Sequence, residues 1–135
     1  MYRSMFIPGD PVPQPRPRIT VRGRHGVAYV PKDHPIHEWR AKVREWMEGS
    51  VPPGQAFPMG GVGLRVVMQF SLCRPKSNKA RLPISRPDLD NLAKAVLDAG
   101  NGVIWGDDSQ VTQVVMRKRW CGFVGVWLEI SEDTE

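Results

Sequence analysis

The sequence predicts a small α+β domain in which a mixed β-sheet packs against two main helices. Two segments, which begin near residues 34 and 88, repeat apolar residues at helical spacing, and the segments around them carry the alternation typical of strands. At 135 residues the chain fits one domain, because each of two halves would bury a core poorly. We therefore expect a single domain over residues 1–135.

The N-terminal residues 1–18 are expected to form an extended basic arm. Five prolines between Pro8 and Pro17 exclude a helix and favour a stiffened path on which Arg16 and Arg18 present charge. Residues 19–21 and 27–30 are short β-prone runs that predict a hairpin, with Arg22 and Arg24 at its tip. The tip suits a phosphate backbone, and its composition equally suits an ordinary solvated turn.

The first helix is predicted to begin at Asp33 or His34, with Pro35 in its first turn, and to end near Gly49. Its apolar stripe of Trp and Met is typical of core or of a subunit interface, so we assign it no chemistry. Residues 52–61, rich in Pro and Gly, predict a loop, and residues 62–72 alternate as a central strand does.

Residues 74–86 are predicted to be a mobile basic loop, because Pro, Ser and Asn dilute the apolar side chains that would order it. A charged run is often only a solvated surface. This one leads directly into a group of acids, which favours phosphate contact by its cations, namely Arg74, Lys76, Lys79, Arg81 and Arg86.

The second helix is predicted to start near Asp88, after Pro87, and to end in the turn Gly100-Asn101-Gly102. This places Asp88 and Asp90 at its N-terminus and Lys94 one turn after Asp90. Residues 103–105 then lead to Asp107 and Asp108, which precede a β-patterned run over residues 111–116 and a final strand over residues 124–130.

If the start of that strand lies beside the start of the second helix, three or four carboxylates meet in one pocket. At about 4 Å each pair costs roughly 1 kcal/mol in water and about 4 kcal/mol at an effective dielectric of 20, so such a cluster needs cations. Oxygen ligands without Cys or His favour Mg²⁺ or Mn²⁺. The alternative is structural: one Asp caps the helix, and Asp90, Lys94 and Asp98 form a surface ion-pair series.

Charge is divided along the chain. Residues 1–86 carry 15 Lys or Arg against 5 Asp or Glu, a net +10, whereas residues 87–135 carry 4 against 9, a net −5. A basic body attracts polyanions, and phosphate neutralisation is the usual source of nucleic-acid affinity. The combination of that basic body with an Asp-Leu-Asp-Asn helix start favours a site that cleaves a polyanion.

Several protein classes are excluded. The chain has no apolar run of membrane-spanning length, and its start lacks the features of a signal peptide, so we expect a soluble cytoplasmic protein. Cys73, Cys121 and the three histidines match no zinc spacing, and reduced structural thiols are expected. Without a phosphate-cradling Gly loop, nucleophile elbow or dinucleotide fingerprint, we expect no small-molecule cofactor.

The stretch Asp88-Leu89-Asp90-Asn91-Leu92-Ala93-Lys94, followed by Asp98-Ala99 and by Trp105-Gly106-Asp107-Asp108-Ser109-Gln110, closely resembles the RusA-like Holliday junction resolvases. The likeness is sharpest over residues 86–119, and the segment Pro11-Val12-Pro13-Gln14-Pro15-Arg16-Pro17-Arg18 resembles the opening of many phage-type members.

This resemblance implies a homodimeric, Mg²⁺-dependent endonuclease of a bacterial or phage-infected cell that nicks two opposing strands of a four-way DNA junction in recombination, repair or phage DNA processing. The essential acids map onto Asp88, Asp90 and Asp108, with Asp107 a less certain ligand, and Lys94 matches the essential lysine. Mn²⁺ is a possible substitute. The expected DNA-binding cations are Arg16, Arg18, Arg22, Arg24, Lys76, Lys79, Arg81 and Arg86.

Two other classes compete with this interpretation. In a non-catalytic nucleic-acid-binding protein the acids would only cap and pair, and Asp90→Asn would leave function intact. In the second class, a metal-dependent nuclease or phosphodiesterase would act on flaps, splayed ends or RNA rather than on junctions. Metal dependence separates the first class from the resolvase, and substrate competition separates the second.

Overall fold

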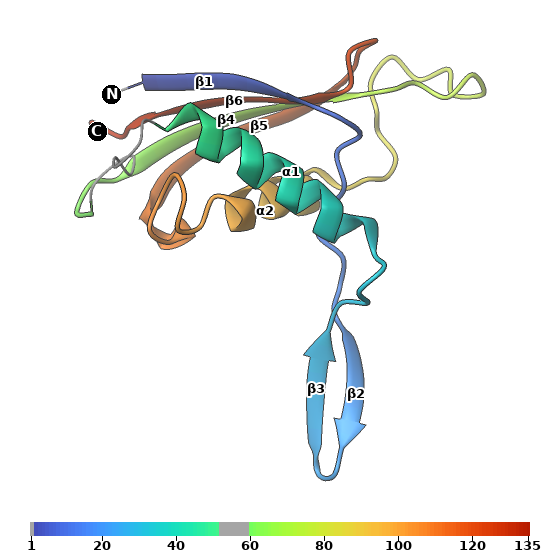
Figure 1. Ribbon diagram of the computed structural model, residues 1–135. Coiled ribbons are helices and arrows are strands. Elements are labelled where there is room, and N and C mark those ends of the chain that lie inside the picture. The colour runs from blue at the N-terminus through green and yellow to red at the C-terminus, as the bar shows by residue number, and fades with distance from the viewer. Residues whose placement is uncertain (1, 52–59) are drawn as a thin grey trace.

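The computed structural model describes residues 2–51 and 60–135 and shows a four-stranded sheet, two α-helices and a separate hairpin in this part of the chain (Figure 1). The α+β prediction with a mixed sheet and two main helices is confirmed. The elements are β1 (Tyr2–Pro8), β2 (Arg18–Arg22), β3 (His25–Tyr29), α1 (Pro35–Ser50), β4 (Leu64–Leu72), α2 (Leu89–Ala99), the 3₁₀ helix η1 (Asp108–Gln110), β5 (Val111–Trp120) and β6 (Gly125–Glu132).

The main sheet has the strand order β1-β6-β4-β5. Strand β4 is antiparallel to β6 and parallel to β5. Strand β1 is antiparallel to β6, with which it pairs from Tyr2↔Ser131 to Pro8↔Gly125. Parallel neighbours need a crossover connection, and α2 supplies it between β4 and β5. The chain therefore runs along β4, back along α2 and forward again along β5.

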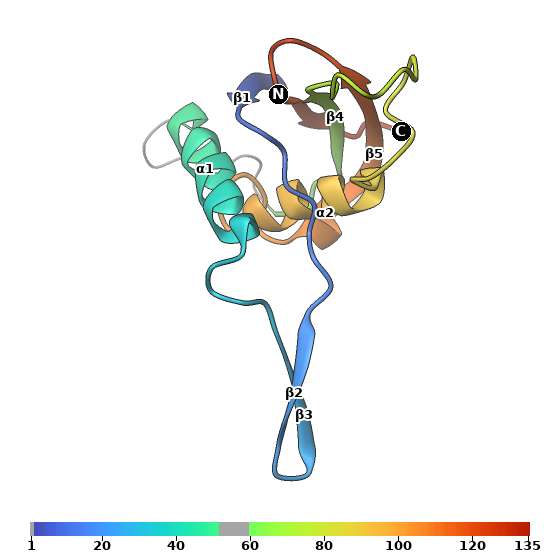
Figure 2. The same cartoon turned by 90° about the vertical axis from the view of Figure 1, so that its right-hand side faces the viewer.

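The core lies between one face of the sheet and the two helices (Figures 1 and 2). Alternate residues of β4, among them Met68 and Phe70, are fully buried against Val43 of α1 and Val96 of α2. Burying each such side chain contributes roughly 1.5–3 kcal/mol. This packing explains why the apolar stripes predicted on both helices are scaffold and carry no chemistry.

Strand β1 is the main departure from the predicted arm. Met5 and Ile7 are buried in the core, so residues 2–8 belong to the sheet, and only residues 9–17 form an extended connection to the hairpin. The alternation is obscured in the sequence because Phe6, on the opposite face, is also apolar. The strand depends on pairing with β6 at the other end of the chain, which local sequence does not encode.

Apart from β1, each predicted helix and strand is present, and the largest difference in bounds is that the run predicted over residues 111–116 continues to Trp120 in β5. Helix α1 starts at Pro35, and its N-cap His34 accepts a hydrogen bond on Nδ1 from the backbone N–H of Ile36 at 3.0 Å. Much of the loop predicted for residues 52–61 lies outside the described residues. None of the described helices is long and apolar enough to cross a membrane.

The β2–β3 hairpin projects away from the sheet and both helices (Figures 1 and 2). Its strands pair from Arg18↔Tyr29 to Arg22↔His25, and nearly all of its side chains are exposed. Residues 73–87, between β4 and α2, contain neither helix nor strand. This loop is held to β5 by Trp120, whose Nε1 donates to the Ala80 carbonyl at 3.1 Å.

Candidate active site

The N-terminus of α2 carries the first two predicted acids. Asp88 is the N-cap residue with an extended backbone, yet its carboxylate makes no capping hydrogen bond, and Asp90 lies in the first helical turn. Both side chains are exposed, and in the described part of the chain neither forms an ion pair. A helix N-terminus favours negative charge, so both carboxylates are available as anionic oxygen ligands.

The segment that enters α2 is held in place by β5. The Lys118 ammonium donates to the carbonyl of Ser85 at 2.7 Å and to that of Pro87 at 2.8 Å. The Arg86–Pro87 peptide bond between these two anchors is cis. Lys118 therefore ties the residues immediately before Asp88 to the end of a sheet strand, although no sequence pattern pointed to it.

A cavity of about 590 Å³ lies at this end of α2. It places the guanidinium-bearing residues Arg16 and Arg86 on the same surface as Asp88, the combination that a phosphate together with a metal ion requires. The backbone N–H of Gln14 donates to the Asn91 carbonyl at 2.8 Å, which fastens the extended segment to α2. The lining residues are Pro13, Gln14, Pro15, Arg16, Arg86, Pro87, Asp88 and Asn91.

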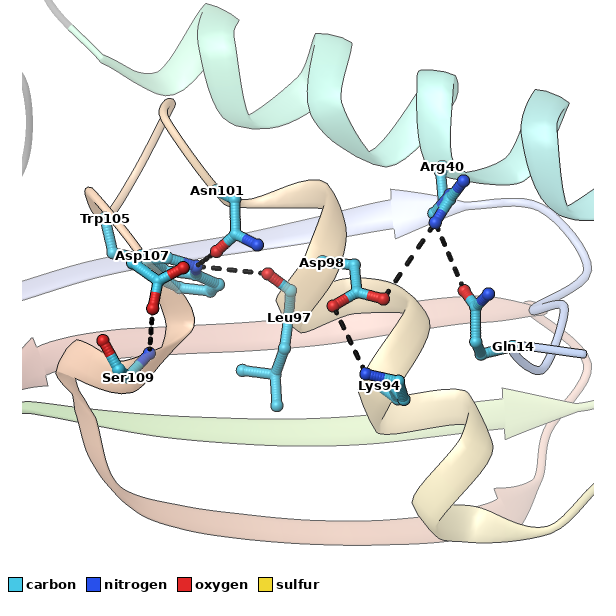
Figure 3. A network of polar contacts seen from close by, with 9 residues as sticks. All are labelled: Gln14, Arg40, Lys94, Leu97, Asp98, Asn101, Trp105, Asp107 and Ser109. Carbon is cyan, nitrogen blue, oxygen red and sulfur yellow. Dashed lines mark hydrogen bonds and ion pairs between the residues drawn. The ribbon is translucent and has the colours of Figure 1, made fainter. Parts of the chain in front are cut away.

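The second pair of acids lies in the turn between α2 and β5. Asp107 is the N-cap of η1, and its Oδ2 accepts a hydrogen bond from the backbone N–H of Ser109 at 3.0 Å (Figure 3). Hydrogen bonds from Ser109, foremost from its hydroxyl and then from its N–H, lower the pKa of the Asp107 carboxyl below its ordinary value. Asp108, the first residue of η1, is half-buried.

Trp105 fixes the position of this turn. Its ring is buried, and its Nε1 lies 3.1 Å from both the Leu97 carbonyl and Asn101 Oδ1 (Figure 3). The ring packs directly over Gly100, where a side chain would clash with it. Trp105 therefore anchors the turn that carries Asp107 and Asp108 to the C-terminal end of α2.

The structure does not bring the two pairs of acids together within one chain. Helix α2 has 11 residues and so spans about 16 Å, with Asp88 and Asp90 at its start and Asp107 and Asp108 beyond its end. Among residues 2–51 and 60–135, no three Asp, Glu, His or Cys side chains form a cluster that could hold a metal ion. The condition for a single pocket, that the start of β5 lies beside the start of α2, is not met within one chain, because α2 runs opposite to the strands that it connects (Figure 1).

Lys94 lies on the exposed surface of α2 and pairs with Asp98. Its Nζ is 3.7 Å from Asp98 Oδ1, and Asp98 Oδ2 is 4.0 Å from Arg40 Nη1 on α1 (Figure 3). Arg40 was not among the site residues predicted from the sequence. The partnership joins residues 58 positions apart, so no local pattern could have identified it.

The eight predicted DNA-binding cations fall into three groups, and all are exposed. Arg16 and Arg86 line the cavity beside Asp88, whereas Arg18, Arg22 and Arg24 belong to the projecting hairpin. Lys76, Lys79 and Arg81 lie in the loop before α2. In the described part of the chain none of the eight forms an ion pair, so their charge is available to an external polyanion.

Residues 8–131 match the family model described as Endodeoxyribonuclease RusA. The match includes the extended segment, the hairpin, both helices, both pairs of acids, β4, β5 and all of β6 but its last residue, whereas only Pro8 of β1 lies within it. No curated protein matches the chain.

Proposed function

The chain belongs to the RusA endodeoxyribonuclease family and is therefore a nuclease, and from this premise we propose that it resolves four-way DNA junctions by paired, symmetric nicks in opposing strands. The observation that carries the proposal is the start of α2, where Asp88 lines a cavity that also presents Arg16 and Arg86, and where neither Asp88 nor Asp90 forms an ion pair with the described residues. This surface combines ligands for a hard cation with donors for phosphate oxygens.

We propose that Asp88, Asp90 and Asp108 hold Mg²⁺, for which Mn²⁺ can substitute, with Asp107 as a further candidate ligand. The donor set fits, because carboxylate oxygens free of competing ion pairs are the ligands that Mg²⁺ prefers. When bound, such an ion supplies Lewis-acid polarisation of the scissile phosphate and acidifies a water molecule. One Asp107 oxygen is already engaged by Ser109, which favours Asp108 over Asp107.

Lys94 is proposed to place its ammonium near the charge that develops on the phosphate oxygens. A compact ammonium on a flexible stem suits this role, whereas a guanidinium has a different shape and hydrogen-bond geometry, so Lys94→Arg should not restore full activity.

The DNA would be held by the cations of the extended segment, the hairpin and the loop. If about five of them, Arg16, Arg18, Lys76, Lys79 and Arg81, neutralise phosphates, the logarithm of the binding constant falls with the logarithm of salt concentration with a slope of about −4 to −5. A slope near zero would contradict the proposal that these cations bind phosphates.

A homodimer is proposed as the active form, because symmetric nicks need two equivalent sites related by a two-fold axis. The course of α2 adds a reason, since this helix, about 16 Å long, lies between Asp88 and Asp90 at its start and the turn that carries Asp107 and Asp108 after its end. A second copy could supply Asp108 to the carboxylates at the start of the first copy's α2. Each metal site would then be shared between two chains.

The test compares the wild-type protein with Asp90→Asn on labelled four-way junction and on matching linear duplex, each with and without Mg²⁺. We expect paired symmetric nicks only with wild-type protein, junction and Mg²⁺, while Asp90→Asn still binds the junction. Binding without cutting on any branched DNA would favour a non-catalytic role, and preferential cutting of flaps, splayed ends or RNA would favour another phosphodiesterase.

A further inference from the structure

Two carboxylates on α2 are spaced to form an ion pair with Lys94, namely Asp90 one turn before it and Asp98 one turn after it. In the structure its ammonium pairs with Asp98 at 3.7 Å, and it forms no ion pair with Asp90 in the described part of the chain. A Lys94–Asp90 pair would place a cation on a carboxylate that the proposed function reserves for metal. The observed pairing of Lys94 with Asp98 therefore leaves the Asp90 carboxylate available to a metal ion.

Asp98 is held from a second side by α1. Its side chain is 23% exposed, and its Oδ2 lies 4.0 Å from Arg40 Nη1, while Oδ1 serves Lys94. Arg40 Nη1 also donates to Gln14 Oε1 at 3.4 Å (Figure 3). Each oxygen of Asp98 thus has its own cation, and Lys94 is drawn toward the C-terminal end of α2 and away from its start.

Gln14 connects this series to the cavity. Its backbone N–H donates to the Asn91 carbonyl at 2.8 Å, and both residues line the cavity that contains Asp88. The contacts Gln14–Arg40–Asp98–Lys94 therefore link the extended segment before the hairpin, α1 and the exposed surface of α2 (Figure 3).

We propose that Asp98 is a positioning residue for Lys94. It keeps the ammonium off Asp90, so that Asp90 can bind metal. Arg40 and Gln14 act through Asp98 by fixing its carboxylate. This inference rests on the proposed function, because it assumes that Asp90 is a metal ligand and that Lys94 serves the reaction.

The competing interpretation is an ordinary surface ion pair with no effect on the site, and the chain offers a matched control. Arg44 and Glu48 form an ion pair at 3.4 Å at the same i,i+4 spacing on α1, with both side chains more than 40% exposed. Glu48→Gln removes a comparable pair remote from Asp90, so it should change neither metal binding nor cleavage.

The test measures Mn²⁺ affinity by electron paramagnetic resonance titration and single-turnover cleavage of a four-way junction. For Asp98→Asn we expect a loss of about tenfold in Mn²⁺ affinity and in the cleavage rate, the size typical for loss of a residue that supports a metal site, with unchanged junction affinity. Lys94→Ala/Asp98→Asn should regain Mn²⁺ affinity, because no ammonium remains to occupy Asp90, and Asp98→Glu should recover part of the cleavage rate.

Wild-type Mn²⁺ affinity and cleavage in Asp98→Asn would overturn this inference and leave the proposed function intact. So would a loss of Mn²⁺ affinity that persists in the double variant, because Lys94 would then not be its cause. If the wild-type protein binds no Mn²⁺ and cuts no junction, the proposed function itself fails, and this inference fails with it.

Discussion

Two aspartates that each precede a helix, Asp88 and Asp107, use their carboxylates differently. Asp107 caps η1 by accepting from Ser109, whereas Asp88 occupies the N-cap position of α2 without a side-chain hydrogen bond. A capping carboxylate is committed to the backbone, while an unused one is exposed to solvent and ligands. At the residue scale, this difference supports Asp88 as a metal ligand more strongly than Asp107.

Asp133 provides a pH-dependent test at the same scale. The Thr112 hydroxyl donates to Asp133 Oδ2 at 2.6 Å, and this bond, with the Glu135 N–H and the Arg65 charge, lowers the pKa of the Asp133 carboxyl. A depressed folded-state pKa contributes stability that is present above the unfolded value and is lost as pH falls through the folded value. Thr112→Val should therefore raise the Asp133 pKa in a carboxyl NMR titration.

The urea midpoints of wild-type protein and Thr112→Val should accordingly differ more at pH 6 than at pH 2. Thr112→Ser keeps the donor and serves as the control. If the midpoint difference stays constant across this range, the stability change would come from the contact of the Thr112 hydroxyl with the Leu64 carbonyl at 3.3 Å. That result would contradict the role of Asp133.

At the element scale, the C-terminal end of α2 and its turn form one packed unit, in which Trp105 lies over Gly100 and is hydrogen-bonded to Leu97 and Asn101. This unit carries Asp107 and Asp108, so its rigidity determines where the second pair of acids lies. The close approach of the ring explains why a glycine is needed at residue 100.

Gly100→Ala is expected to destabilise the protein by about 1–3 kcal/mol, because its Cβ would overlap the Trp105 ring in a packed core. Gly49→Ala is the matched control: it lies in α1 with open space around it, and alanine there should be neutral or stabilising by up to about 1 kcal/mol. Urea unfolding of both variants checks this pair of opposite effects. Equal changes in the two variants would contradict the packing argument.

The role of the hairpin in DNA binding can be tested separately, because the hairpin projects from the body of the protein (Figure 2). Removing charge from it should therefore leave the core unchanged. Arg22 and Arg24 are not among the five cations counted for the slope above, and a phosphate contact from each would add to it. Arg22→Gln/Arg24→Gln should then weaken junction binding and make the salt slope shallower by about 2, because each phosphate contact contributes roughly 0.9. Fluorescence anisotropy over a range of salt concentrations measures this slope.

The control for the hairpin is Arg65→Gln/Arg117→Gln, which removes the same charge from the face of the sheet opposite the helices. We expect this variant to keep the wild-type slope. A similar loss from both double variants would mean that net charge, and not the hairpin, governs binding.

At the scale of the whole molecule, the crossover β4–α2–β5 determines how the acids are distributed. Lys118, near the end of β5, contacts the residues before α2, and Gln110, just before β5, contacts Val62 just before β4. The two pairs of acids therefore lie at opposite ends of the connected strands. In the proposed function, a complete metal site therefore draws its acids from two chains.

Complementation between inactive variants tests the shared site. Asp90→Asn and Asp108→Asn should each be inactive alone, while a mixture that forms heterodimers should regain single-strand nicking of a junction. One site of the heterodimer would then combine intact Asp88 and Asp90 from one chain with intact Asp108 from the other. If each site lies within one chain, both sites of the heterodimer stay defective and the mixture remains inactive.

Local patterns in the sequence predicted most of the elements and most of the chemical groups of the candidate site. Apolar periodicity located α1, α2, β4 and the hairpin, because helices and tight hairpins are stabilised by neighbours in the chain. It also identified the acids at the start of α2 and the cations before it, since side-chain chemistry is explicit in the residues. The family resemblance drawn from the same motif agrees with the match over residues 8–131.

Which distant segments meet follows from the folded chain and not from local patterns. Strand β1 exists because it pairs with β6 across almost the whole chain, and Asp98 is fixed because Arg40 on another helix reaches it. The separation of the acids also depends on the direction in which α2 crosses the sheet. Such relations depend on contacts between residues far apart in sequence, which local periodicity does not encode, and they determine where each predicted ligand lies.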